Sequence, residues 1–218
     1  MSERWRVGCM LYMLMLLLGG LALGGCVARY YQSTQREPEL PVNQFLQKQF
    51  EALPPGWTFH KVSASDIWTD TDFTRARWAV ASGFQYEVTL ETYRRNQIHE
   101  EIHVFWNSFA AKVNSRPSPS SVNAGKGYVP KGWIYHPPNA NQFEFGCEGG
   151  DGVAQPEWCR LILRYEEYVI VLSTPIADYM TLEDLKQLLE VIDREMVDFL
   201  RHSALRPGPR KVPELLDP

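Results

Sequence analysis

The stretch Cys159-Arg-Leu-Ile-Leu-Arg-Tyr165, followed closely by Tyr168-Val-Ile-Val-Leu-Ser173, decides the fold of this chain. Both runs are apolar and rich in β-branched residues, as expected of strands in the centre of a sheet. Only Glu166 and Glu167 separate them, so a hairpin is expected, although this pair lacks the Asn or Gly that is common in tight turns. The sequence therefore predicts an antiparallel sheet built around this hairpin.

Further strands are predicted earlier in the chain. The clearest follows Gly83, where Phe84, Tyr86, Val88 and Leu90 alternate with polar residues and so place one face on a core and the other in water. Shorter segments with the composition of strands lie at residues 57–62, 77–80, 133–135 and 143–145. Together with the hairpin they predict a sheet of about six to seven strands.

Three segments have the spacing of amphipathic helices. The first begins at Pro41, and the second is expected over residues 97–113, where apolar residues recur every three or four positions. The last begins at Thr181, with Asp184 as its capping partner. The order of helix, strands, helix, strands and helix predicts a single α+β domain over residues 41–203, an antiparallel sheet with flanking helices.

The first 25 residues have the parts of a secretory signal peptide, because two arginines precede a long apolar run that ends in small residues. The closing segment Leu23-Gly24-Gly25-Cys26 resembles the lipobox of bacterial lipoproteins. This resemblance implies cleavage after residue 25, so that residues 1–25 are a signal peptide, and acylation of Cys26 with chains such as palmitate. The alternative is an uncleaved transmembrane helix, since an apolar run of roughly 19 residues is long enough to span a bilayer.

A lipid anchor would place the domain at the cell membrane, on its extracytoplasmic side, with the lipid bilayer as its first partner. Each buried acyl methylene contributes about 0.8 kcal/mol, so two or three chains on Cys26 would hold the protein without a spanning helix. Residues 26–40 would then be the lipidated cysteine and a tether, because they show no apolar periodicity. Residues 204–218, rich in proline and charge, are predicted to be a flexible tail.

The charge balance argues against a nucleic-acid partner. Loss of residues 1–25 removes one acidic and two basic side chains, which leaves 25 acidic and 20 basic residues out of 26 and 22. Phosphate backbones select clustered lysine and arginine, and this chain has no run of basic residues. The apolar and aromatic content predicts a folded domain.

Two cysteines remain once Cys9 is cleaved off and Cys26 is acylated: Cys147 and Cys159. Outside the cytoplasm an even pair predicts a disulfide, and a loop of about a dozen residues would contribute roughly 2–3 kcal/mol to stability. A metal-binding pair or a reactive thiol is the alternative, although the two cysteines do not lie in a C-x-x-C spacing.

One motif could carry chemistry, because His99-Glu100-Glu101-Ile102-His103 fits the pattern H-E-x-x-H. It resembles the motif of zincin metallopeptidases and lies in the segment predicted to be helical. On a helix, residues four apart share a face, so His99 and His103 could bind Zn²⁺ while Glu100 orients a water as general base. The candidates for a third ligand are downstream carboxylates such as Glu144, Glu148 and Glu157.

Several features favour a structural interpretation of the same segment. Zincins usually keep the two middle positions of the motif uncharged, whereas this chain has Glu101, and no third histidine follows. The segment would then be a surface helix whose histidines border the apolar stripe. Tyr128, Trp133 and Tyr135 could line a ligand groove, but aromatic residues more often belong to the core.

Two functions from different classes follow from these features. The leading hypothesis is a non-enzymatic, membrane-tethered lipoprotein domain that needs no cofactor. It would bind a protein partner or ligand of the envelope through the sheet face or through the long loop at residues 114–132. The alternative is a small zinc-dependent hydrolase that uses His99, Glu100 and His103.

Overall fold

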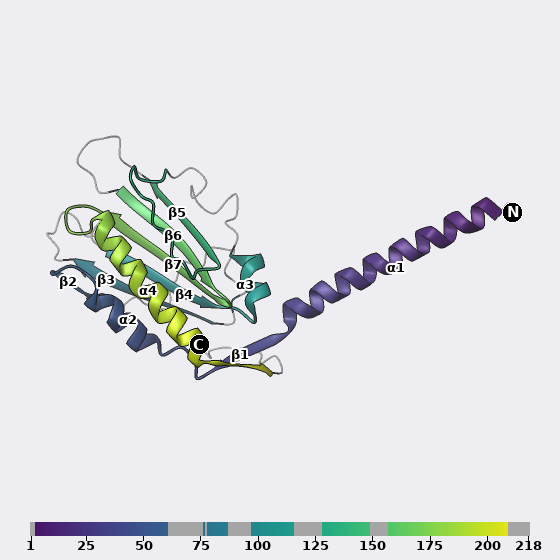
Figure 1. The fold of residues 1–218 in the computed structure, drawn as a ribbon, viewed down its shortest axis with the longest axis horizontal. Helices are drawn as coiled ribbons and strands as arrows, with labels where there is room; N and C mark the ends of the chain where they lie inside the picture. Colours follow the sequence, from purple (N-terminus) through teal and green to yellow (C-terminus); the bar gives the residue numbers. More distant parts are fainter. Residues whose placement is uncertain are drawn as a thin grey trace, which may run out of the picture.

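A computed structural model of the chain describes residues 3–60, 76, 78–86, 97–115, 128–148 and 157–208 (Figure 1). They form one α+β domain, from which a long N-terminal helix projects. The helices are α1 (Glu3–Tyr31), α2 (Val42–Glu51), α3 (Ser108–Asn114) and α4 (Leu182–His202). The strands are β1 (Ser33–Glu37), β2 (Trp57–His60), β3 (Trp78–Tyr86), β4 (Gln97–Val104), β5 (Gln142–Glu148), β6 (Glu157–Tyr165), β7 (Tyr168–Ile176) and β8 (Ala204–Gly208).

The predicted β6–β7 hairpin is confirmed and lies inside a six-stranded antiparallel sheet with the order β2-β3-β4-β7-β6-β5. Tyr165 and Tyr168 face each other at its end, so Glu166 and Glu167 form the whole turn. Glu166 has a φ of 52°, which is uncommon for a residue other than glycine. Its amide donates to the Asn141 side-chain oxygen at 2.7 Å, so a neighbouring loop supports the turn in place of a favourable turn sequence.

The main core lies between the sheet and the two helices α2 and α4 (Figure 1). Alternate residues of β4, β6 and β7 point toward these helices, and the apolar stripe of α4 covers them. The fully buried members include Ile98, Ile102, Leu161, Leu163, Ile170, Leu172, Leu185, Leu188, Leu189 and Ile192. A smaller apolar cluster on the opposite face joins β6 and β7 to α3 through Phe105, Ala110, Ala111, Ile162, Val169 and Val171.

The predicted helix over residues 97–113 is wrong for its first half, because residues 97–104 form strand β4. Ile98 and Ile102 are four residues apart, and this spacing puts two side chains on one face in a helix and also in a strand. The spacing therefore cannot distinguish a helix from a strand in so short a segment. The helical part is the single short helix α3, which begins at Ser108.

The expected tether and tail meet in a second, two-stranded sheet. Strand β1 (33–37) pairs antiparallel with β8 (204–208), where neither segment was expected to have regular structure. The residues of β1 are polar, and β8 contains a proline and a glycine, so neither has the apolar alternation by which a strand is recognised. The rest of the expected tail, from residue 209, is outside the described residues.

Residues 133–135, predicted as a strand, instead follow a turn that places Gly132 at a φ of 93°. Trp133 and Tyr135 pack against the main core, while Ile134 between them is 96% exposed and Tyr128 is exposed as well. Most of the predicted loop at 114–132, the end of the strand at 84–90 and residues 61–62 lie outside the described residues.

The remaining elements follow the sequence closely. Pro41 is the N-cap of α2, and Thr181 and Asp184 form the predicted capping box at the start of α4. Cys147 and Cys159 lie opposite each other on β5 and β6 and form the predicted disulfide, with both residues fully buried.

Candidate functional site

The H-E-x-x-H motif lies on strand β4, and this changes what its residues can do together. Successive side chains of a strand point to opposite faces, so His99, Glu101 and His103 share one face while Glu100 lies on the other. Glu100 therefore cannot orient a water at a metal held by His99 and His103. The arrangement that a zincin needs is not formed.

The two histidines bind the carboxylate that lies between them. Glu101 Oε1 is 2.9 Å from His99 Nε2, and Glu101 Oε2 is 2.8 Å from His103 Nε2. Burial raises the pKa of Glu101, but the hydrogen bonds and charges of His103 and His99 outweigh it and lower the pKa to about 2. The ionised carboxylate can only accept, so each Nε2 carries the proton of its bond.

This face of β4 offers no assembled metal site. Among the described residues, no group of three or more His, Cys, Asp or Glu side chains is placed to hold a metal ion. The Glu101 carboxylate occupies the space between the two imidazoles. Of the proposed third ligands, Glu144 and Glu148 lie on β5, three strands away and so about 14 Å distant, and Glu157 begins β6, two strands away.

Glu100 points into the main core, where it contacts α2. Gln49 Nε2 donates to Glu100 Oε1 at 3.1 Å, and both side chains are fully buried. Burial raises the pKa of Glu100 to about 7, against a smaller opposite effect of the Gln49 hydrogen bond. Within the described residues, Glu100 Oε2 and Gln49 Oε1 make no hydrogen bond. A proton on Oε2 would let the acid donate to Gln49 Oε1, so the pair suits a neutral carboxylic acid.

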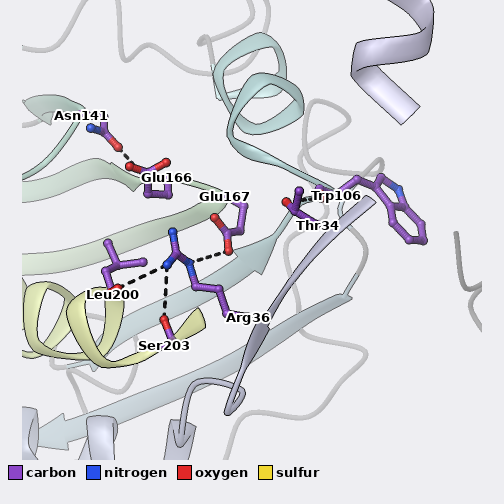
Figure 2. A network of polar contacts seen from close by, with 8 residues as sticks. All are labelled: Thr34, Arg36, Trp106, Asn141, Glu166, Glu167, Leu200 and Ser203. Atoms are coloured by element: carbon purple, nitrogen blue, oxygen red, sulfur yellow. Dashed lines mark hydrogen bonds and ion pairs between the residues drawn. The ribbon is translucent and has the colours of Figure 1, made fainter. Parts of the chain in front are cut away.

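A network of polar contacts between distant segments lies elsewhere, where the N-terminal segment meets the domain. We call this set of residues the junction: Arg29, Gln32, Thr34, Arg36, Trp106, Asn107, Glu167, Leu200 and Ser203. It joins α1 and β1 to the end of β4, the β6–β7 turn and the end of α4. Figure 2 shows the part of it that is formed by Thr34 and Arg36 with their partners. Sequence analysis did not identify these residues as a site, since the segment was expected to be a tether.

Arg36 is the centre of the junction. Its Nε donates to Glu167 Oε1 at 2.8 Å, and its Nη1 donates to Leu200 O and Ser203 Oγ, each at 3.3 Å (Figure 2). The side chains of Arg36 and Glu167 are only 7% and 4% exposed. Burial outweighs the attraction of Arg36 and raises the pKa of Glu167. Such a pair depends on its additional hydrogen bonds, which here come from Leu200 in the last turn of α4 and from Ser203, the C-cap of that helix.

The backbone on either side of Arg36 is bound as well. The Thr34 N–H donates to Trp106 O at 2.9 Å, and its hydroxyl donates to the same oxygen at 3.2 Å. Thr34 lies opposite Pro207 on β8, and its N–H points away from that strand, as the N–H of every second residue of an antiparallel pair does. Asn107 caps α3, and its Nδ2 donates to the carbonyls of Arg29 and Gln32. The domain is therefore fixed to the chain as far back as residue 29.

The free cysteine Cys26 lies just before this bound segment. It is exposed on α1, and the Leu23-Gly24-Gly25-Cys26 segment lies within the continuous helix. In the part of the chain that the structure describes, no helix meets the length and hydropathy required to cross a membrane.

The surface also has a hollow of about 460 Å³ along α4. It is lined by charges of both signs, including Glu190, Arg194 and Arg201. Asp193 at its inner wall accepts from Tyr165 Oη at 2.9 Å and from Asn139 Nδ2 at 2.7 Å. These bonds hold the loop before β5 against α4, so Asp193 has a structural role in the fold.

In comparisons with known proteins, no family model, no curated protein and no solved structure matches this chain. The site is therefore interpreted from its own geometry.

We predict that Glu100→Gln stabilises the protein at alkaline pH. The pKa of Glu100 is about 7 in the folded state against 4.5 in the unfolded state, so the folded protein holds a proton that unfolding releases between these values. The free energy of unfolding then falls by roughly 3 kcal/mol as pH rises from about 4.5 to 7. Urea denaturation at pH 4.5, 6 and 8 measures this, and the variant should gain most at pH 8.

The exposed Glu51 on the same helix as Gln49 provides the control, and Glu51→Gln should follow the wild-type pH dependence. A Glu100→Gln protein with the same pH dependence as the wild type would contradict the neutral buried acid.

The junction predicts a large difference between two ion pairs whose arginines both lie on the two-stranded sheet. Arg36→Met leaves the buried Glu167 without its cation and should lower the free energy of unfolding by roughly 3–5 kcal/mol. The control is Arg206→Met, because the Arg206–Glu37 pair is 67% and 51% exposed and should contribute about 0–1 kcal/mol. Chemical denaturation of both variants gives the comparison, and equal losses would show that the burial of Arg36 has no energetic consequence.

Proposed function

We propose that this chain is a membrane-tethered extracytoplasmic lipoprotein whose domain acts as a non-enzymatic binding or accessory module of the cell envelope. The observation that carries the proposal is the position of Cys26. It ends a segment that resembles a lipobox, and it precedes by only three residues the first backbone group that is bound to the domain. An acyl group on Cys26 would thus act directly on the position of the domain.

The disulfide supports an extracytoplasmic location. Cys147 and Cys159 are bonded and fully buried between β5 and β6, and such bonds persist in oxidising compartments. An acylated Cys26 would have no free thiol, so it could not exchange with this disulfide.

The geometry of β4 favours the binding module over the zinc hydrolase. His99 and His103 bind Glu101, and Glu100 serves the main core on the opposite face. The residues of the motif thus have structural partners, and Glu100 is not placed to act as the general base of a zinc hydrolase.

The test is the chemical form of residue 26 in a bacterial host. Full-length protein should be recovered in the membrane fraction with a mature N-terminus at Cys26 and should incorporate labelled palmitate. Cys26→Ser should lose the label and keep the leader. Cys9→Ser, which changes a cysteine inside the leader, is the control and should be processed and labelled as the wild type is.

Intact-mass spectrometry measures cleavage after residue 25, and palmitate labelling measures acylation of Cys26. A membrane-bound protein that retains Met1 and carries no label would contradict lipidation and favour an uncleaved membrane helix.

A further inference from the structure

We propose that the end of the domain around the junction lies directly on the bilayer, so that one face of the protein contacts anionic lipid headgroups. We call this the lipid-facing end and define it by Arg29, Lys112, Val113, Leu205 and Arg206. The inference rests on the proposed lipidation of Cys26, and its test separates the two.

The chain between Cys26 and the domain is short. Asn107 Nδ2 donates to the Arg29 carbonyl at 2.9 Å, so only Val27 and Ala28 lie between Cys26 and a residue bound to the domain. Three residues span at most about 10 Å even when fully extended. The Thr34–Trp106 and Arg36–Glu167 bonds follow immediately in the chain. They keep the residues after Arg29 on the domain, so these residues do not add to the free segment. The domain therefore has no freedom to rise far above an anchored Cys26.

The helices α1 and α3 and the two-stranded sheet surround the point of attachment. The helix α1 leaves the domain next to α3, and β1 continues from it into the pair with β8 (Figure 1). Exposed side chains at this end are Arg29 on α1, Lys112 and Val113 on α3, and Leu205 and Arg206 on β8.

The exposed side chains that define this end are apolar or basic. Val113 and Leu205 are apolar and 45% and 51% exposed, and three basic side chains lie around the same attachment point. Arg29 also stacks over the Phe109 ring at 5.3 Å. Of the acidic side chains near this end, Glu37 pairs with Arg206 and the buried Glu167 pairs with Arg36, while Glu166 in the β6–β7 turn is partly exposed. Basic residues close to an anionic membrane are attracted to its headgroups, whereas the mature chain as a whole is acidic.

The orientation has a consequence for any envelope partner. The β6–β7 turn lies at the junction, so the strands run away from the bilayer, and the opposite end of β6 is roughly 26 Å farther out. The Cys147–Cys159 disulfide and the start of α4 lie toward that outer end. A protein partner would meet these elements, since the lipid occupies the other end.

The test compares the distances of two positions from the membrane in the lipidated protein. A fluorophore is attached to Val113→Cys at the lipid-facing end or to Glu183→Cys at the start of α4. Residue 183 lies about 30 Å along α4 from the end of that helix at the junction. Both positions are exposed, and the disulfide and acylated Cys26 leave the new cysteine as the reactive thiol. The protein is reconstituted in phosphatidylcholine vesicles that contain phosphatidylglycerol and a lipid with a nitroxide headgroup.

The proposal predicts loss of most of the fluorescence at residue 113 and little loss at residue 183. A linker of about 20 Gly and Ser residues inserted after Ala28 should restore the emission at residue 113, because such a linker reaches roughly 25 Å. The double variant Lys112→Glu and Arg206→Glu should restore part of the emission at residue 113, and only in anionic vesicles.

Equal quenching at the two positions in a protein that is acylated and floats with the vesicles would overturn the lipid-facing end while lipidation stands. Equal emission from wild type and charge-reversed protein would overturn the role of the basic residues. A protein that carries no acyl chain and does not float would instead refute the proposed function.

Discussion

The buried ion pair between Arg36 and Glu167 is the constraint on which the position of the N-terminal segment depends. Two charges removed from water lose several kcal/mol of hydration each, and their attraction offsets this only with good geometry and further hydrogen bonds. Arg36 obtains those bonds from Leu200 and Ser203 at the end of α4. The strand β1, the β6–β7 turn and α4 must therefore meet at one point, so a stretch that resembles a tether becomes part of the domain.

The adjacent carboxylates Glu100 and Glu101 show how a strand gives neighbouring residues opposite environments. Glu101 lies between two imidazoles and has a pKa of about 2, whereas Glu100 lies in the apolar core beside Gln49 and has a pKa of about 7. In the first case the hydrogen bonds and charges of His103 and His99 together outweigh desolvation, whereas in the second case desolvation dominates. Alternation along β4 thus turns a motif with the sequence of a metal site into two separate structural contacts.

Sequence patterns predicted what depends on local periodicity. The apolar runs around Glu166-Glu167, the cap at Thr181 and the cysteine pair were sufficient for the α+β class, the last helix and the disulfide. The segment from Ile98 to Ile102 failed because its spacing suits both helix and strand. The junction could not be predicted, since Arg36 is an ordinary polar residue until the fold brings Glu167, 131 positions away, to its side.

The most direct measurement of this account is hydrogen exchange at the Thr34 amide in the mature, oxidised protein. That N–H donates to Trp106 O only if the N-terminal segment is seated on the domain. The account predicts protection of Thr34 comparable to that of the sheet, for example the fully buried Ile170 on β7. Exchange of Thr34 at the rate of an unstructured peptide, with Ile170 still protected, would show that the segment is a free tether and would contradict the account.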